Sequence, residues 1–229
     1  MIPIPKAHPL QVIETDLRPI SLTATLSKLL ESFVGTWILD RIQDKLDVRQ
    51  YGALKGRSTT HALVDMMHHW YKAVDHGQSV GTVFVDFAKA FDHVDYNILI
   101  ARLTEFGLPD VIIRWTCSFL RHRRQRVKIG EVMSDWLAMN AGMPQGSYLG
   151  PLTFITLVDS LQASCMTHKY VDDTTLNELV VKSGTSNMQV CCDELAQQSE
   201  QAQMNISSCK TKEMLIGSIS KDPPVHLVL

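Results

Sequence analysis

The chain has 229 residues and a formal net charge of −2, and 45% of its residues are hydrophobic and 20% charged. This composition excludes a disordered, collagen-like or coiled-coil chain, and a pI near 6.5 argues against a dedicated nucleic-acid binder, which is usually basic. Five cysteines without CxxC spacing argue against a disulfide framework and a zinc site, and the absence of a membrane-length apolar run or a signal peptide predicts an intracellular protein, in the nucleus or the cytoplasm.

The first third of the chain is expected to be extended and then helical. Residues 1–20 are rich in proline, which fixes the backbone and disfavours helix just before it. Hydrophobic residues at steps of three and four predict a helix over residues 25–46. A loop over residues 51–60 follows, and Thr59 or Thr60 can cap a second helix that Gly77 ends.

The remainder of the chain mixes strands and helices. β-Branched residues predict a strand over 80–87, followed by helices over 96–106 and 111–120 and short strands near 126–129 and 136–139. A loop over 142–151 opens a helix, and 165–171 and 174–179 are expected to form a hairpin. A helix over 187–204 and a strand over 213–216 complete the order. This order predicts an α/β (α+β) fold of the split βαβ kind, with an antiparallel sheet and helices on one face.

The segment Tyr170-Val171-Asp172-Asp173 places two carboxylates at a strand end. Such a pair is costly when buried unless a cation binds, and divalent metals prefer oxygen ligands. The ordinary alternative is that aspartate is simply a common turn residue. Asp86 ends another apolar strand, which an antiparallel sheet could bring beside Asp172. We expect Asp172 to be the stronger ligand of the adjacent pair, and the three carboxylates predict a two-metal phosphoryl-transfer site.

Four further features fit this chemistry, and each also has an ordinary interpretation. Residues 142–151 hold three glycines and two prolines, which allow a ligand to approach the backbone closely or simply form a loop. The basic residues of 121–128 could follow a phosphate backbone or be solvated. Lys210 could contact pyrophosphate or be an ordinary surface lysine. Phe91 could be an aromatic residue of the hydrophobic core.

Together and in this order, these segments resemble the reverse transcriptase domain of non-LTR (LINE-type) retrotransposons, from about residue 4 to 217. The matching segments are 17–22 with Lys28 and Glu31, 51–62, 85–92, 142–151, 170–173, and Asn205 with 210–212. Six such segments in sequence order are specific to the family. The resemblance implies a right-hand polymerase with a fingers-like region over 1–79, a palm with the catalytic motifs over 80–218, and a short tail over 219–229.

The resemblance implies an RNA-directed DNA polymerase that uses an RNA template, a DNA primer and dNTPs, with no membrane. Two Mg²⁺ ions, or Mn²⁺, would assist nucleotidyl transfer to the primer 3′-hydroxyl. The implied catalytic residues are the metal ligands Asp86, Asp172 and Asp173, with Lys210 as a general acid. The implied nucleotide-binding residues are Arg18, Lys28, Phe87, Gln145, Gly146 and Phe91, whose ring would exclude a 2′-hydroxyl. The implied nucleic-acid-binding residues are Arg57, Arg123, Arg124 and Arg126.

The chain also departs from the family pattern. Tyr148 stands where a small or aliphatic residue is usual, and residues 53–55 replace the usual run before Gly56. With no endonuclease before the domain and no thumb after Ser218, we expect a fragment whose missing parts are encoded elsewhere or lost. The rival hypothesis is an inactive remnant that at most binds nucleic acid. A third, a nucleotide cyclase-like enzyme, is disfavoured by the Pro-Gln-Gly loop and the fingers segments.

Overall fold

A computed structural model describes residues 1–6, 8–9, 11–182 and 184–221. The chain divides into two compact units, and each is described by itself. Unit 1 comprises Met1–Ile42 and Phe91–Thr153, and unit 2 comprises Gln43–Ala90 and Phe154–Leu229. Across the described ranges, no helix has the length and apolar character needed to cross a membrane. Most of the tail expected over 219–229 lies outside the described residues.

Unit 1 begins with a pair of antiparallel strands, β1 (Ile2–Pro5) and β2 (Leu17–Ile20). A one-turn helix, α1 (Ile13–Asp16), precedes β2, whereas the sequence predicts an extended segment throughout. The turn forms because the Asp16 carboxylate accepts hydrogen bonds from the backbone N–H groups of Gln11 (2.9 Å) and Val12 (3.0 Å). Such local bonds from aspartate compete with extended structure.

Three predicted helices of unit 1 are confirmed: α2 (Thr25–Ile42), α4 (Tyr96–Glu105) and α5 (Asp110–Leu120). The short strands are more finely divided than predicted. β4 (Arg123–Gln125) pairs with β7 (Leu137–Met139), and β5 (Lys128–Ile129) pairs with β6 (Val132–Met133). Gly130, at φ 58°, provides the tight turn between β5 and β6. The helix α6 (Leu149–Val158), which begins in unit 1 and ends in unit 2, follows the Gly- and Pro-rich loop, as predicted.

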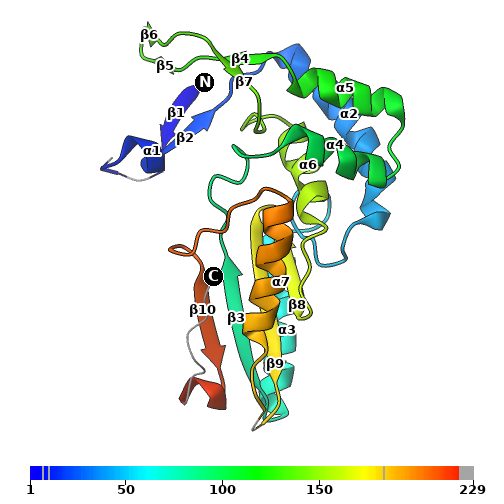
Figure 1. Ribbon diagram of the computed structural model, residues 1–229, viewed down its shortest axis with the longest axis vertical. Helices are drawn as coiled ribbons and strands as arrows, with labels where there is room; N and C mark the ends of the chain where they lie inside the picture. Colours follow the sequence, from blue (N-terminus) through cyan, green and yellow to red (C-terminus); the bar gives the residue numbers. More distant parts are fainter. Residues whose placement is uncertain (7, 10, 183, 222–229) are drawn as a thin grey trace. The chain divides into compact units, whose positions relative to one another are not determined.

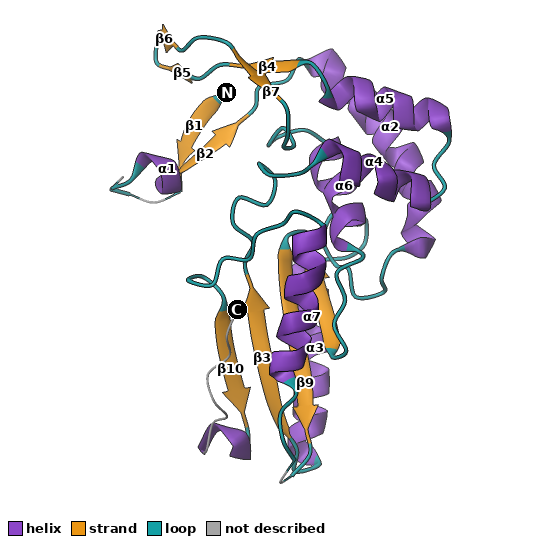
Figure 2. Cartoon of the chain, viewed as in Figure 1, coloured by secondary structure: helices purple, strands orange, loops and turns teal. Residues whose placement is uncertain are grey.

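Unit 2 contains a four-stranded antiparallel sheet in the order β10-β3-β9-β8 (Figure 2). Its strands are β3 (Ser79–Val85), β8 (Met166–Tyr170), β9 (Asp173–Val180) and β10 (Lys212–Ile216). The hairpin β8–β9 lies where the sequence predicts it, and every residue of β3 pairs with a residue of β9. The mixed class with an antiparallel sheet is therefore confirmed.

Helices cover both faces of this sheet, α7 (Met188–Gln201) in front and α3 (Thr59–Asp75) behind (Figure 1). Trp70 of α3 donates from Nε1 to Asn177 Oδ1 (2.9 Å) on one face. A Cβ on Gly81 would lie 3.7 Å from Met188 Cε, on the other. The sequence predicts helices on one face, and this detail differs because β3 is buried on both sides: Val80 is 0% exposed and Val83 1%.

The α3 helix is fixed at its start and along one side. Ser58 caps it by accepting a hydrogen bond from the N–H of His61, one residue before the predicted cap. Its apolar side buries Met66, Trp70 and Ala73 against Val80 of β3. Burial of each large apolar side chain contributes about 1.5–3 kcal/mol, so this packing holds α3 firmly behind the strand that leads to Asp86.

Candidate active site

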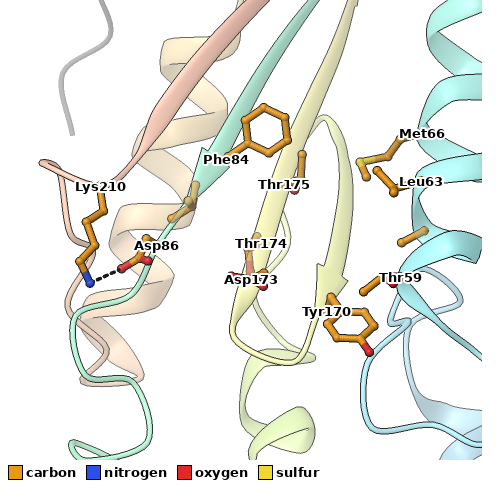
Figure 3. Close-up of a pocket in the computed structure, with 12 residues that line it drawn as sticks. Thr59, Leu63, Met66, Phe84, Asp86, Tyr170, Asp173, Thr174, Thr175 and Lys210 are labelled. Atoms are coloured by element: carbon orange, nitrogen blue, oxygen red, sulfur yellow. Dashed lines mark ion pairs between the residues drawn. The ribbon is translucent and has the colours of Figure 1, made fainter. Parts of the chain in front are cut away.

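The neighbouring ends of β3 and β9 bring two carboxylates together in unit 2. Asp86 directly follows β3, and Asp173 begins β9, whose next residue, Thr174, is the partner of Val85. Both aspartates line one cavity of about 420 Å³ (Figure 3). Strand pairing therefore joins two residues that are far apart in the sequence.

The adjacent pair of aspartates is divided between the turn and the strand. Tyr170 and Asp173 are the last paired residues of the hairpin, so Val171 and Asp172 form its two-residue turn. Asp172 is half-buried in this turn, while Asp173 lies in the cavity with Asp86. The relative strength of Asp172 and Asp173 as ligands stays a prediction.

The two strand-end carboxylates carry like negative charges, which repel each other. Although Asp173 as a whole is exposed, partial burial of its carboxyl group and then the charge of Asp86 raise its pKa. The Oδ1 atom of Asp86 is buried, and no group among the described residues donates a hydrogen bond to it. The ammonium of Lys210 lies 3.5 Å from this oxygen, as the dashed line in Figure 3 shows. The site thus holds more negative charge than its own donors satisfy.

This donor set fits a hard divalent cation, because carboxylate oxygens are the ligands that Mg²⁺ and Mn²⁺ prefer. The fit depends on the pair Asp86 and Asp173, with Asp172 next to them in the turn. Within the ranges that the structure describes, no group of three His, Cys, Asp or Glu side chains is arranged to hold a metal ion.

The cavity beside the carboxylates is mainly apolar. Side chains of α3 face side chains of the sheet across it (Figure 3). Thr59, Leu63 and Met66 come from the helix, and Phe84 and Thr175 from neighbouring strands. Lys210 comes from the segment before β10. The carboxylates therefore lie at one end of a hollow that the first turns of α3 border.

A second group of predicted residues comes together in unit 1, around the Gly- and Pro-rich loop. Met143 donates its N–H to the carbonyl oxygen of Phe91 (2.7 Å), and Gln145 Nε2 donates to Asp92 Oδ1 (3.3 Å). Ser21, directly after β2, donates its N–H to the carbonyl oxygen of Gln145 (2.7 Å). The loop therefore joins Phe91 and Gln145 to the strand that carries Arg18.

Gly146 makes the close approach to β2 possible. Its φ of 99° is a conformation that side chains rarely adopt, and a Cβ there would lie 3.2 Å from the carbonyl oxygen of Ser21. Arg18 and Lys28 are both exposed. Phe87, in contrast, is only 6% exposed and its backbone pairs with Ile206, so its side chain lies in the core of unit 2.

Two of the four predicted nucleic-acid-binding arginines bind the protein's own backbone. Arg57 Nη1 donates to the carbonyl oxygens of Val48 (2.7 Å) and Gln50 (2.6 Å). Arg123 Nη2 donates to the carbonyl oxygen of Gly142 and to the hydroxyl of Tyr96 (2.6 Å). The other two are placed differently: Arg126 lies 4.6 Å from the centre of the Trp136 ring, and Arg124 is exposed.

Sequence reasoning missed a polar network between α3 and the hairpin. Asp65 Oδ2 accepts hydrogen bonds from the Tyr51 hydroxyl and from His168 Nε2, both at 2.9 Å. Asn177 Nδ2 lies 3.1 Å from His168 Nδ1 and Trp70 donates to the oxygen of the same amide. The available signal was the presence of His168 and Asn177 on the two strands of the hairpin.

The network holds His168 in one form. Burial lowers its pKa, against the opposing effect of Asp65, so the ring is neutral at pH 7. A neutral ring that donates from Nε2 to Asp65 can accept from Asn177 at Nδ1. For Asp65, burial raises the pKa, but the hydrogen bonds from His168 and Tyr51 outweigh it and the net shift is downward. Every polar atom of the His168 ring is thereby satisfied.

Comparisons with known proteins show which family this chain resembles. Residues 4–227 match the family model described as reverse transcriptase (RNA-dependent DNA polymerase). The chain is 34% identical to a probable RNA-directed DNA polymerase from transposon BS of Drosophila melanogaster, over 60% of this chain and 15% of that protein. It is 26% identical to the RNA-directed DNA polymerase from mobile element jockey of the same species, over 84% of this chain and 22% of that protein.

The chain thus spans at most 22% of the length of these relatives. Among solved structures, apo telomerase from Candida tropicalis is similar with a TM-score of 0.62 at 11% identity, over 85% of this chain and 37% of that one. At this identity the similarity shows the fold alone. It is a polymerase fold with a palm sheet and helices, as the sequence predicts.

Proposed function

Since this chain belongs to the reverse transcriptase (RNA-dependent DNA polymerase) family, we propose that it copies an RNA template into DNA from dNTPs and a DNA primer. Its relatives place it with the retrotransposon members of that family. The observation that carries the proposal is the position of Asp86 and Asp173 in one cavity at neighbouring strand ends. An intracellular location, in the nucleus or the cytoplasm, is part of the same proposal.

In this proposal, Asp86, Asp172 and Asp173 hold two divalent metal ions. Bound ions of this kind activate the primer hydroxyl and neutralise charge on the phosphates. The protein contributes carboxylate oxygens that strand pairing fixes in advance. The exposed ammonium of Lys210 lies in the same cavity, 3.5 Å from Asp86, and would serve as the proton donor to the pyrophosphate.

The loop of unit 1 is proposed to bind the incoming nucleotide. Gln145 and Gly146 line its pocket, and the Phe91 ring excludes a 2′-hydroxyl. The roles of these residues are supported by the backbone hydrogen bonds that join the loop to Phe91 and to the residue after β2. Arg18 reaches the triphosphate, with Lys28 as a companion, because guanidinium donors suit phosphate oxygens. Phe87, whose side chain is buried in unit 2, would contribute only through the packing of that unit.

The nucleic-acid-binding arginines are proposed to differ in their effect. Arg124 is exposed on β4 and is the strongest candidate for a phosphate contact. Arg126 lies over the Trp136 ring and is a second candidate. Arg57 and Arg123 would contact nucleic acid only with the donors that their backbone bonds leave over. The division into fingers over 1–79 and palm over 80–218 is a proposal of the same kind.

Primer extension on an RNA template, with Mg²⁺ and dNTPs, tests this function. We expect extension by the wild type and a loss of about 100-fold or more in Asp172→Ala, since metal-ligand carboxylates supply several kcal/mol of transition-state stabilisation. Asp193→Ala is the matched control, because Asp193 is exposed on α7. A folded wild-type protein that extends no primer would favour the inactive remnant instead. An Asp172→Ala variant that is fully active would contradict the role of Asp172 as a metal ligand.

A further inference from the structure

A buried glutamine lies against the turn that carries Asp172. Gln50 is 0% exposed, and its Oε1 accepts hydrogen bonds from the backbone N–H groups of Gly52 (2.9 Å) and Val171 (3.2 Å). In the described part of the chain, its Nε2 is buried without a hydrogen-bond partner. The amide oxygen therefore serves as an acceptor for two backbone N–H groups, and one of them belongs to the Asp-Asp turn.

This turn needs an external support because its backbone is unfavourable. Val171 has a φ of 60°, in the left-handed region. A β-branched residue is a genuine outlier there, and such strain persists only where the surroundings determine the conformation more strongly than the residue's own preference does. Strain of this kind is concentrated at functional sites.

The segment around Gln50 supplies these surroundings. Gln50 and Lys169 form a parallel bridge, in which Tyr51 donates its N–H to the Lys169 carbonyl oxygen (2.8 Å) and Lys169 donates to that of Arg49 (2.9 Å). Arg57 in turn donates to the carbonyl oxygen of Gln50 (2.6 Å). The glutamine is thus fixed on both sides before its side chain reaches the turn.

Gly52 lets this segment come close enough. A Cβ at this position would lie 2.5 Å from Val171 N and 2.8 Å from the carbonyl carbon of Tyr170, so no other residue fits without displacing the turn. The N–H of Gly52 and the N–H of Val171 then share the same acceptor. The backbones at Gly52 and Val171 therefore approach each other closely, and Gln50 Oε1 lies between their N–H groups.

We propose that Gln50 is a positioning residue for the catalytic turn. Its amide oxygen holds the N–H of Val171, keeps the turn in the left-handed conformation, and so sets Asp172 and Asp173 beside Asp86. Gln50 itself touches no substrate in this account. The proposal rests on the proposed polymerase function, because its effect on catalysis passes through these carboxylates.

Three variants of the full chain test the proposal: Gln50→Met, Val171→Gly, and the two combined. Methionine has nearly the shape of glutamine but no amide oxygen, so we expect kcat for RNA-templated extension to fall about 10-fold or more while the KM for dNTP changes by less than about 3-fold. Glycine adopts a positive φ without cost. The double variant should therefore recover most of the lost kcat.

Thr82→Val is the matched control for a general loss of stability. Thr82 is also buried in the sheet and donates to Asn177 Oδ1 (3.2 Å), but it lies away from the turn. We expect this variant to lower stability and leave kcat of the folded protein within about 2-fold. If Gln50→Met keeps the wild-type kcat, or if Val171→Gly restores none of the loss, the proposal is overturned.

Hydrogen exchange at the Val171 amide separates this proposal from the polymerase function. We expect protection in the wild type and exchange at least about 10-fold faster in Gln50→Met, since the N–H loses its acceptor. An unchanged exchange rate overturns the positioning role even in an active enzyme. If the wild type extends no primer, the polymerase function fails, and the exchange rates still decide whether Gln50 holds the turn.

Discussion

Lys169 is a lysine without exposed side-chain surface, next to the Tyr170 that ends β8. Its Nζ donates to Asp47 Oδ2 (3.2 Å) and to the carbonyl oxygen of Asp159 (2.8 Å), and burial lowers its pKa. Lys169→Met would leave the Asp47 carboxylate, 13% exposed, without its cation. We expect the free energy of unfolding in urea to fall by about 3–5 kcal/mol.

The exposed Lys72 on α3 provides the control for that substitution. Lys72→Met should change the free energy of unfolding by no more than about 0.5 kcal/mol. Equal stability of Lys169→Met and the wild type would show that the buried ion pair gains no more than its burial costs. Adding Asp47→Leu to Lys169→Met should recover part of the loss, because no buried charge is then left alone.

His168 predicts how stability depends on pH. Burial lowers its pKa from the ordinary 6.5, Arg49 and His69 add to the effect, and Asp65 opposes it. Below about pH 6.5 the unfolded chain therefore binds a proton at this ring more readily than the folded protein does. The stability of the fold decreases as the pH is lowered through this range. We expect unfolding to become easier at pH 5.5 than at pH 7.5, and His168→Gln to reduce this difference. An identical pH dependence in the two proteins would contradict the assignment.

At the level of elements, α6 and the loop before it depend on one buried carboxylate. Glu31 of α2 is 1% exposed, and its Oε2 accepts hydrogen bonds from the N–H groups of Tyr148 (2.9 Å) and Leu149 (3.4 Å). Glu31→Ala leaves both donors without this acceptor, at a cost of about 2–3 kcal/mol in unfolding experiments. Glu31→Gln keeps an acceptor oxygen and should lose less. If alanine and glutamine are equally stable, the helix start does not depend on Glu31.

Helices were the elements that could be predicted best. The apolar residues of α3 recur at three- and four-residue steps, and this periodicity is a direct property of the sequence. The presence of a helix on each face of the sheet could not be predicted, because the continuous apolar run of β3 is compatible with burial on one face or on both. The helix α1 was missed because it depends on the Asp16 side chain and not on periodicity.

The candidate site was predictable only where the residues themselves carry the chemistry. Asp86, Asp172 and Asp173 could be proposed as site residues because carboxylates at strand ends are unusual and the order of motifs is specific. Gln50 could not be found, because its role depends on a single contact with the Val171 N–H, which only the register of Gln50 against Lys169 creates. The same holds for Asp65 and its bond to His168.

For the molecule as a whole, the charge predicts weak binding of nucleic acid. With a net charge of −2 there is little general attraction to phosphates, so affinity for an RNA–DNA duplex must come from local basic residues. We expect binding to weaken steeply with salt, and Arg124→Gln to lower the slope of log K against log salt by about 1. Fluorescence anisotropy over a salt series measures this slope. An unchanged slope would exclude a phosphate contact by Arg124.

We propose that pairing of β3 with β9 builds a divalent-metal site from Asp86 and its neighbours. Mn²⁺ binding, measured by electron paramagnetic resonance on the wild type, Asp86→Asn and Asp193→Asn, tests this claim. We predict that the wild type and Asp193→Asn bind Mn²⁺ with equal affinity, and that Asp86→Asn binds it about 10-fold or more weakly, because one carboxylate ligand is lost. Equal binding by all three proteins would contradict the claim.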